Sequence, residues 1–313
     1  MIPKPVLERI DEKRKFLNKK RPLSRSVVQK LKEQLAFEMT FNSNAIEGNQ
    51  LTLKETYLVI QEGITVKGKP LKDHLEAKNH HEALGFLFEL VEKDKKHTVS
   101  EKLIRSLQHL VIKEMERGEA GKYRQGDVMI TGSKHKPPPA YEIPRLMNEL
   151  IQWIRKNSKK LHPVELASIA HHKLVFIHPF ADGNGRTARL FMNLLLMQRG
   201  YPLVVILKND RKKYYRVLEK ADKGSTGDLG KFVAQAVERS MNIYLKALET
   251  STHKKDKWVP LSVLSQSSSF SEKYLNLLVR SGKLEAYKEG RIWLSTQKAL
   301  DDYLKNRQRK RKK

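Results

Sequence analysis

The sequence predicts an all-α protein with one short β-hairpin and a small second module at its C-terminal end. Three observations support this fold class. Apolar residues recur at helical spacing through most of the chain, as in 24–48. Only 123–142 alternates apolar and polar residues around turn residues and prolines. The polar, charged segment 250–257 separates the last long helical pattern from a pattern of two short helices, a hairpin and a final helix over 258–304.

The helical patterns follow one another along the chain in order. Gly48 ends the first, and Thr52 and Glu55 have capping-box spacing before the next stretch. Gly200, with Pro202 beyond it, ends another helix. The predicted helices cover 24–48, 71–93, 99–117, 142–157, 163–177, 186–199, 210–222 and 228–250. The predicted domains are an N-terminal helical region at 1–70, a helical domain at 71–250, the module at 258–304 and a disordered basic tail at 305–313.

Composition limits the classes of function. The chain has 313 residues, 62 basic against 35 acidic, and a formal net charge of +27. Such an excess favours polyanionic partners, although basic residues spread along the whole chain also fit a solvated lysine-rich surface. Cysteine is absent, which excludes disulfides, thiolate metal sites and cysteine nucleophiles. There is no long apolar run and no apolar segment near the N-terminus, so we expect a cytoplasmic protein without a membrane partner.

The stretch 178-HPFADGNGRTAR-189 concentrates polar groups directly before an apolar helix. That helix would begin near Gly183, Asn184 and Gly185, where free N–H groups and the helix dipole favour an anion. Arg186 and Arg189 are three residues apart and share one helix face. Arginine binds phosphate through two parallel hydrogen bonds. The stretch therefore predicts a di- or triphosphate site, the alternative being a glycine-rich turn with surface arginines.

Two further residues of this stretch indicate the reaction. Asp182 suits Mg²⁺, which is bound through one or two carboxylates together with phosphate oxygens. His178 opens the loop, and histidine is the usual general base near neutral pH. We therefore predict attack of a hydroxyl group on a nucleotide phosphorus, with Mg²⁺ and the arginines stabilising the developing charge.

The complete stretch resembles the Fic-domain signature, H-x-F-x-[D/E]-G-N-G-R-x-x-R, and the resemblance extends over about 40–250. It implies a helical enzyme that transfers AMP from ATP to a Ser, Thr or Tyr hydroxyl of a target protein. It also implies the site residues: His178 as general base, Asp182 as Mg²⁺ ligand, Gly183, Asn184 and Gly185 as the phosphate cradle, and Arg186 and Arg189 at the β- and γ-phosphates.

A second stretch, 43-SNAIEGN-49, places Ser43 and Glu47 on one helix face. In isolation it predicts an ordinary helix end. Beside the Fic signature it resembles the family's inhibitory motif, [S/T]-x-x-x-E-[G/N], which Ser43, Glu47 and Gly48 match. The resemblance implies that Glu47 pairs with Arg189 and repels phosphate, either within one chain or across a dimer. In some relatives the same glutamate positions a water that removes AMP, and this alternative stays open.

The family also uses a hairpin flap to hold its target. Residues 123–136 match it in position, with Val128 and Ile130 as the expected edge residues that pair with an extended target segment. The alternative is a structural hairpin that covers the core.

Several aromatic and histidine residues have no motif of their own. Tyr214 and Tyr215 are candidates to flank the adenine of ATP, although one of two such neighbours on a helix usually lies in the core. His171 and His172 are expected to be packed or solvated rather than to bind a metal. His80 and His81 are expected to lie at the surface.

The pattern at 258–304 resembles a winged helix-turn-helix module. Lys273, Asn276 and Arg280 would face a DNA groove, and Lys288 and Arg291 would contact phosphates. The alternative is a module used for dimerisation or target docking. The sequence therefore favours a self-inhibited protein adenylyltransferase that uses ATP and Mg²⁺ and acts on an unidentified target protein. Modification of the chain itself, a homodimer and an enzyme that mainly removes AMP stay open as alternatives. The second interpretation is a DNA-binding regulator that senses nucleotide.

Overall fold

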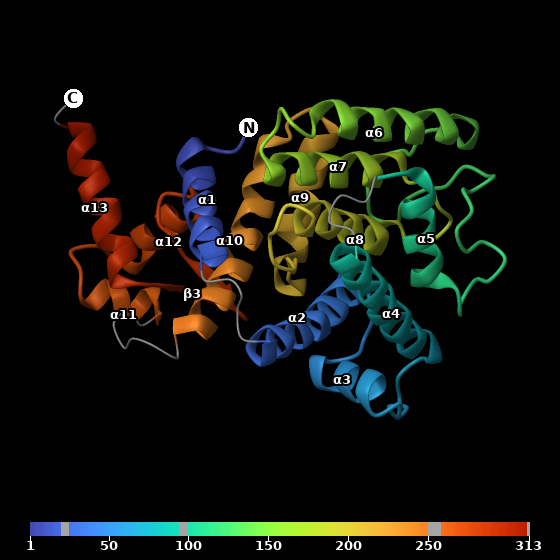
Figure 1. Cartoon of the computed structure of the whole chain (residues 1–313), viewed down its shortest axis with the longest axis horizontal. Helices are drawn as coiled ribbons and strands as arrows, with labels where there is room; N and C mark the ends of the chain where they lie inside the picture. The colour runs from blue at the N-terminus through green and yellow to red at the C-terminus, as the bar shows by residue number, and fades with distance from the viewer. Residues whose placement is uncertain (20–24, 94–98, 250–257, 312–313) are drawn as a thin grey trace. The chain divides into compact units, whose positions relative to one another are not determined.

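The computed structural model describes residues 1–19, 25–93, 99–249 and 258–311 (Figure 1). The chain divides into two compact units. The first unit contains Met1 and Val28–Val233, and the second contains Ile2–Val27 and Ala234–Lys313. This division differs from the predicted boundaries, because the first helix groups with the C-terminal part of the chain and not with residues up to 70.

The first unit is helical, as the sequence predicts. Helix α8 is its centre: it packs against α4, α5 and α7, and nearly all of its side chains are buried (Figure 1). The elements are α2 (Arg25–Ile46), α3 (Leu53–Gln61), α4 (Leu71–Lys93), α5 (Glu101–Ile112), η1 (Ala140–Glu142), α6 (Ile143–Asn157), α7 (Pro163–Ile177), α8 (Asn184–Met197), η2 (Lys208–Asp210), α9 (Arg211–Asp222) and the start of α10 (Gly227–Glu249).

Helix ends follow the local signals in the sequence. Oγ1 of Thr52 accepts from the Glu55 N–H at 3.2 Å, and the Glu55 carboxylate accepts from the Thr52 N–H at 2.7 Å, so the predicted capping box is present. Gly200 has a φ of 82°, and the Tyr201 N–H closes the end of α8 by donating to the Leu196 carbonyl. These signals explain why the predicted and observed helices differ mainly by a few residues at their ends.

The predicted hairpin at 123–136 is not a hairpin of paired strands. The chain turns there through a hydrogen bond from the Ser133 N–H to the Ile130 carbonyl at 3.0 Å, but residues 123–139 form no strand ladder. Side chains hold this loop instead. The Ala140 N–H donates to Asp127 Oδ1 at 2.8 Å, and His135 Nε2 lies 2.8 Å from the Phe176 carbonyl. The three prolines at 137–139 offer no N–H groups, so pairing could not continue beyond residue 136.

The second unit contains the element order predicted for 258–304. Its three-stranded antiparallel sheet has the order β1-β3-β2, and Gly290, with a φ of 60°, forms the turn between β2 and β3. Its elements are α1 (Lys4–Lys19), β1 (Val259–Pro260), α11 (Leu261–Gln266), α12 (Glu272–Arg280), β2 (Tyr287–Glu289), β3 (Ile292–Ser295), α13 (Gln297–Arg311) and the end of α10. The disordered tail predicted at 305–313 is wrong up to residue 311, because α13 continues through it.

The second unit has its own apolar core. The apolar faces of α11, α12 and α13 pack around Leu275, Leu278 and Leu300. Helix α1 is attached within its unit by ion pairs from Arg9 to Glu238, at 3.0 Å, and from Lys13 to Glu285. Within the described ranges, no helix is both long enough and apolar enough to cross a membrane.

Candidate active site

A tight loop joins α7 to α8. His178 ends α7 in the left-handed conformation, with a φ of 50°, and is the one non-glycine residue with positive φ in the described part of the chain. The Asn184 side chain closes the loop: its Oδ1 accepts from the Phe180 N–H at 3.0 Å and its Nδ2 donates to the Phe180 carbonyl at 2.8 Å. The side-chain amide of Asn184 is thus occupied inside the loop, so the cradle role predicted for this residue would have to come from its main-chain N–H.

The imidazole of His178 is neutral at physiological pH. Burial lowers its pKa to about 4, since a charged ring is poorly solvated there, and the nearby Arg124 guanidinium acts in the same direction. Arg124 also holds the loop, because its Nε donates to the His178 carbonyl at 2.9 Å. A neutral imidazole can accept a proton, so this residue is in the protonation state that a general base requires.

The first turn of α8 presents main-chain N–H groups that the helix itself does not use. Its first helical hydrogen bond runs from the Thr187 N–H to the Gly183 carbonyl at 2.8 Å, so the N–H groups before Thr187 precede the helical ladder. Gly183 has a φ of 80°, and a Cβ there would lie only 3.0 Å from Ile112 Cγ2. A side chain is therefore excluded at this position by both conformation and space.

Arg189 is bound by Ser43 and Glu47, the two residues that match the inhibitory motif. It is 1% exposed, its Nη2 lies 2.7 Å from Glu47 Oε1, and its Nε donates to Ser43 Oγ at 2.9 Å. Arg189 Nη2 also donates to the Ser43 carbonyl at 2.8 Å. A Cβ on Gly185 would overlap Glu47 Oε1, so the carboxylate lies directly against the first turn of α8. The predicted contact between Glu47 and Arg189 is present, and the Glu47 carboxylate lies where the sequence predicts a bound phosphate.

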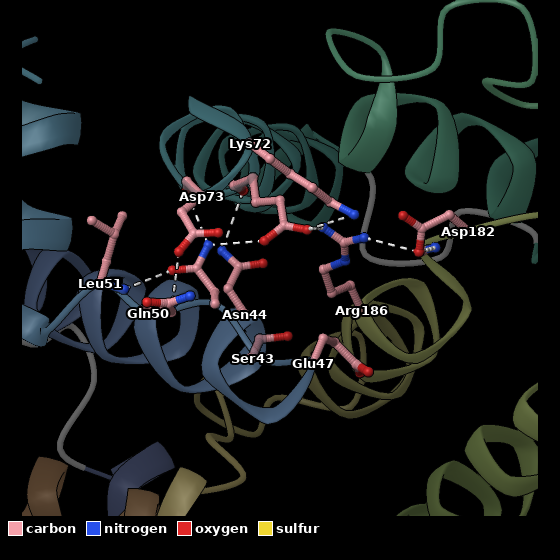
Figure 2. Close-up of polar contacts among 12 residues, drawn as sticks. Ser43, Asn44, Glu47, Gln50, Leu51, Lys72, Asp73, Asp182 and Arg186 are labelled. Atoms are coloured by element: carbon pink, nitrogen blue, oxygen red, sulfur yellow. Dashed lines mark hydrogen bonds and ion pairs between the residues drawn. The ribbon is translucent and has the colours of Figure 1, made fainter. Parts of the chain in front are cut away.

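Arg186 lies between two carboxylates. Its Nη2 is 3.2 Å from Asp182 Oδ1, and its Nη1 is 3.1 Å from Glu76 Oε1 on α4 (Figure 2). Arg186 is 2% exposed. The pKa of Asp182 is lowered: burial acts to raise it, but the Arg186 charge and the Gly183 N–H outweigh burial. Glu76 was not predicted from the sequence, since no motif marks it.

The comparisons with known proteins agree with this geometry. A family model described as Fic/DOC matches residues 98–196. Fic-1 (residues 134–508) from C. elegans has a TM-score of 0.72 at 30% identity, over 79% of this chain and 73% of that one. A Fic domain containing signaling protein from Bacteroides thetaiotaomicron has a TM-score of 0.70 at 30% identity, over 78% of this chain and 97% of that one.

The chain belongs to the Fic/DOC family. Among curated relatives, the protein adenylyltransferase Fic of Nematostella vectensis is 37% identical over 246 residues, which cover 78% of this chain. The chain spans only 56% of the length of that relative.

The tyrosines of this Fic chain differ in role. Tyr214 is fully buried beneath Arg189, and its hydroxyl lies 2.9 Å from His171 Nε2. Tyr215 is 39% exposed, and its hydroxyl donates to the Ile46 carbonyl at 3.3 Å. Of the two predicted adenine contacts, Tyr214 is therefore a core residue, and Tyr215 is partly exposed with the Arg211 guanidinium 4.9 Å from its ring centroid.

The Asp182 carboxylate fits Mg²⁺. Its Oδ1 contacts Arg186 and the Gly183 N–H, while its Oδ2 makes no hydrogen bond or ion pair with any residue that the structure describes. A hard cation takes carboxylate oxygens, and Mg²⁺ commonly completes its shell with water and nucleotide phosphates. Asp182 would hold the metal through Oδ2.

The loop at 123–139 reaches the Fic motif through Arg124, which sequence reasoning missed. Arg124 is buried, and it donates to the carbonyls of Gly126 at 2.8 Å and Pro138 at 2.6 Å as well as to His178. Val128 and Ile130 are half-buried, and Met129 between them is almost fully exposed. The only sequence signal for Arg124 was its place at the start of the predicted flap.

The remaining histidines are mostly packed. Burial lowers the pKa of His171 to about 3, and His172 Nε2 lies 2.9 Å from Asp222 Oδ1. The surface location predicted for His80 is wrong: it is fully buried, 3.3 Å from Thr40 Oγ1. Among the residues with described positions, no three acidic, histidine or cysteine side chains group as a metal site.

Proposed function

We propose that this chain transfers AMP from ATP to a Ser, Thr or Tyr hydroxyl of a protein, and that Glu47 restrains the reaction. The printed name of the Nematostella vectensis relative, protein adenylyltransferase Fic, supports the class of reaction. The observation that carries the proposal is the neutral imidazole of His178 in the loop that leads into the first turn of α8, whose two arginines are buried.

In the proposed reaction the hydroxyl oxygen of the target attacks the α-phosphorus of ATP. His178 takes the hydroxyl proton as the new oxygen–phosphorus bond forms. The bond from the α-phosphorus to the bridging oxygen breaks, and pyrophosphate leaves with the electron pair. AMP remains on the target through a phosphodiester bond, so atoms and charge balance.

The chain supplies binding and charge compensation for this step. The N–H groups of the first turn of α8, together with Arg186 and Arg189, would bind the phosphates beyond the α-phosphorus. Mg²⁺ at Asp182 would neutralise phosphate charge when it is bound. The loop at 123–139, with Val128, Met129 and Ile130 at its turn, would hold an extended segment of the target.

Glu47 would inhibit by occupying the place of a phosphate. Its carboxylate pairs with Arg189 at 2.7 Å and lies against Gly185. A phosphate at the same position would meet like charge and a side chain already paired. ATP would then bind weakly, or with its α-phosphate turned away from His178. The Glu47 side chain is 31% exposed. We propose as an alternative that its carboxylate positions a water that removes AMP from a modified target.

The test of the chemistry uses the full chain with Glu47→Gly and ATP labelled at either the α- or the γ-phosphate, with Mg²⁺ and cell lysate. Label from the α-position, but not from the γ-position, should remain on lysate proteins or on the chain itself. His178→Ala in the same background should abolish this labelling. Transfer of the γ-label, or α-labelling that survives His178→Ala, would show that the proposed reaction is wrong.

A second activity is favoured by the second unit. Helix α12 exposes Lys273 and Arg280, and Arg291 is exposed at the tip of the β2–β3 hairpin. These residues fit the DNA contacts expected of a winged helix-turn-helix module. Mobility shift of duplex DNA across a salt series tests this. Loss of binding with Lys273→Ala and Arg280→Ala would support it, and no shift at low salt would remove it.

A homodimer through the first unit also forms part of the proposal. Large apolar side chains are exposed on α3, on the segment after it and at the start of α4: Leu53, Tyr57, Ile64 and Leu71. Exposed apolar residues that gather on neighbouring elements commonly mark an interface between proteins. Sedimentation of the wild type and of Leu71→Asp should give a dimer and a monomer, and two monomers would contradict this part.

A further inference from the structure

A single buried carboxylate on α4 connects the Fic motif to the segment that follows the inhibitory helix. Glu76 is 6% exposed, and both of its carboxylate oxygens are engaged. Its Oε1 forms the 3.1 Å ion pair with Arg186 Nη1, and its Oε2 accepts from Asn49 Nδ2 at 2.9 Å. Lys72 Nζ, at 4.0 Å from Oε1, is largely exposed and contributes less.

Asn49 comes two residues after Glu47 and is fixed on every side. Its Nδ2 also donates to the Asp73 carbonyl at 3.0 Å, and its Oδ1 accepts from the Leu51 N–H at 3.0 Å. Its own N–H donates to the Asn44 carbonyl at 3.1 Å, across the turn that contains Glu47. The side chain of Asn49 therefore ties the turn carrying Glu47 to α4.

The surrounding contacts strengthen the same connection. Asn44 Nδ2 donates to the main-chain carbonyl of Glu76 at 3.2 Å, and the Gln50 N–H donates to Asp73 Oδ2 at 2.7 Å (Figure 2). The residues around the turn thus bond to two successive acidic positions of α4. In Figure 2 the labelled side chains of Asn44 and Gln50 lie on one side of this network, and Arg186 lies on the other.

We propose that Glu76 is a positioning residue with two functions: one carboxylate oxygen holds Arg186 in place for a phosphate, and the other, through Asn49, holds Glu47 against Arg189. The two arginines of the motif therefore have carboxylate partners with different effects on nucleotide binding. Glu47 competes with the nucleotide for Arg189, whereas Glu76 supports Arg186 from α4. Inhibition then depends on Asn49, whose side chain touches neither arginine of the motif.

The physical reason for assigning both functions to one residue is charge. Arg186 is buried, and a buried guanidinium needs a paired carboxylate. Asp182 supplies one, but it is more exposed and lies in the loop, so Glu76 is the partner fixed on a helix. The second oxygen of a buried carboxylate also needs a donor, and Asn49 provides it. The same Glu76 carboxylate that pairs with Arg186 therefore also holds Asn49, and with it the turn that carries Glu47.

The experiment separates the two functions by comparing variants in two backgrounds, wild type and Glu47→Gly. Asn49→Ala removes the connection to the turn, and Glu76→Gln keeps an acceptor for Asn49 but removes the charge that faces Arg186. Gln50→Ala is the matched control, because the described contacts of Gln50 are made by its main chain. The readouts are the Kd for an ATP analogue whose α–β bond cannot be cleaved, and amide hydrogen exchange of residues 44–51.

In the wild-type background, Asn49→Ala should tighten analogue binding by roughly tenfold, the effect of losing one hydrogen bond to a buried charge. It should also speed amide exchange at 44–51. In the Glu47→Gly background the same substitution should leave the Kd unchanged, because no inhibitory carboxylate remains to be held. Glu76→Gln should weaken binding by roughly tenfold in the Glu47→Gly background, through loss of the ion pair with the buried Arg186.

Three outcomes would overturn the proposal. The first is that Asn49→Ala gives the same Kd and the same amide exchange as Gln50→Ala. The second is that Asn49→Ala changes the Kd equally in both backgrounds, and the third is that Glu76→Gln leaves the Kd unaltered in the Glu47→Gly background. If Asn49→Ala fails to fold, Asn49→Ser replaces it, since a serine hydroxyl at this position is too short to bond Glu76.

This inference rests on the proposed function only in taking the site to bind a nucleotide. Analogue binding and amide exchange do not require transfer. If Glu47→Gly labels no protein but binds the analogue, the proposed reaction fails and the positioning role is still decided. If the analogue does not bind to any variant, the role assigned to Arg186 fails together with it, while amide exchange still decides whether Asn49 holds the turn.

Discussion

Arg189 Nη2 lies 2.7 Å from Glu47 Oε1, and the same guanidinium bonds the hydroxyl and the carbonyl of Ser43. All three contacts come from the C-terminal part of α2 and the turn that follows it, which lie far from Arg189 in the sequence. The arginine that the Fic motif offers to a phosphate is therefore already paired. This relationship makes access of the nucleotide, and not the absence of a catalytic group, the expected limit on activity.

The first prediction concerns nucleotide affinity. Glu47→Gly should tighten binding of a non-cleavable ATP analogue by roughly ten- to a hundredfold, because a competing carboxylate paired to Arg189 is removed, a change of about 1.4–2.8 kcal/mol. Calorimetric titration of wild type and variant measures this. Glu82→Gly, an exposed-face change on α4, serves as the control; equal affinities for wild type and Glu47→Gly would contradict the competition.

The second prediction concerns His178. In the Glu47→Gly background, His178→Ala should lower the rate of AMP transfer by roughly a hundred- to ten-thousandfold, the usual contribution of a general base. The Kd for the analogue should stay within about twofold, since the imidazole is assigned to the proton and not to the phosphates. A parallel loss of affinity would instead make His178 a binding residue.

The third prediction concerns the loop at 123–139. Arg124→Ala should lower the free energy of unfolding by about 2–4 kcal/mol, because three partly buried carbonyl hydrogen bonds from a buried guanidinium are lost. Urea denaturation at pH 7 measures it. Arg145→Ala, which removes an exposed arginine paired with Glu142 and Glu149, should change stability little. Similar values for the two variants would show that Arg124 does not anchor the loop.

The fourth prediction concerns pH. Burial, with the nearby charge of Arg189, lowers the pKa of His171 to about 3, below the value near 6.5 of the unfolded chain. Between these values the unfolded chain binds a proton that the folded chain does not. Stability is therefore complete above about pH 6.5 and falls as the pH decreases toward 3, by up to about 1.4 kcal/mol per pH unit for this residue.

The variant His171→Gln checks this dependence. Its free energy of unfolding, measured in urea at pH 7, 6 and 5, should fall less steeply with decreasing pH than that of the wild type. His80, also buried and with a lowered pKa, should contribute in the same direction and leaves a residual slope. Parallel curves for wild type and variant would mean that His171 is protonated equally in the folded and unfolded states.

Much of the fold could be predicted because its signals are local. Periodicity, the Thr52–Glu55 capping box and Gly200 mark helix positions without knowledge of the tertiary structure. The predicted hairpin at 123–136 was wrong for a tertiary reason. An alternating pattern around Val128 and Ile130 fits a strand, but Arg124 and His135 bond the segment to neighbouring parts of the fold and no ladder forms.

The site was predictable where it forms a continuous motif and not where it depends on packing. His178, Asp182, Arg186 and Arg189 stand in one stretch, and the partner of Arg189 was predicted from a second stretch. Glu76 could not be found this way, because nothing in the pattern of α4 distinguishes it from the acidic residues of a solvated helix face. Tyr214 and Tyr215 are adjacent in sequence, and only the packing of α9 decides which ring is buried.

The most direct test of the central claim compares AMP transfer by wild type and Glu47→Gly, with α-phosphate-labelled ATP, Mg²⁺ and lysate. The account predicts that labelling rises by roughly tenfold or more on substitution, as expected if the contact between Glu47 and Arg189 opposes nucleotide binding by at least about 1.4 kcal/mol. Equal labelling by the two proteins would contradict it, because the pairing of Glu47 with Arg189 would then not restrain the enzyme.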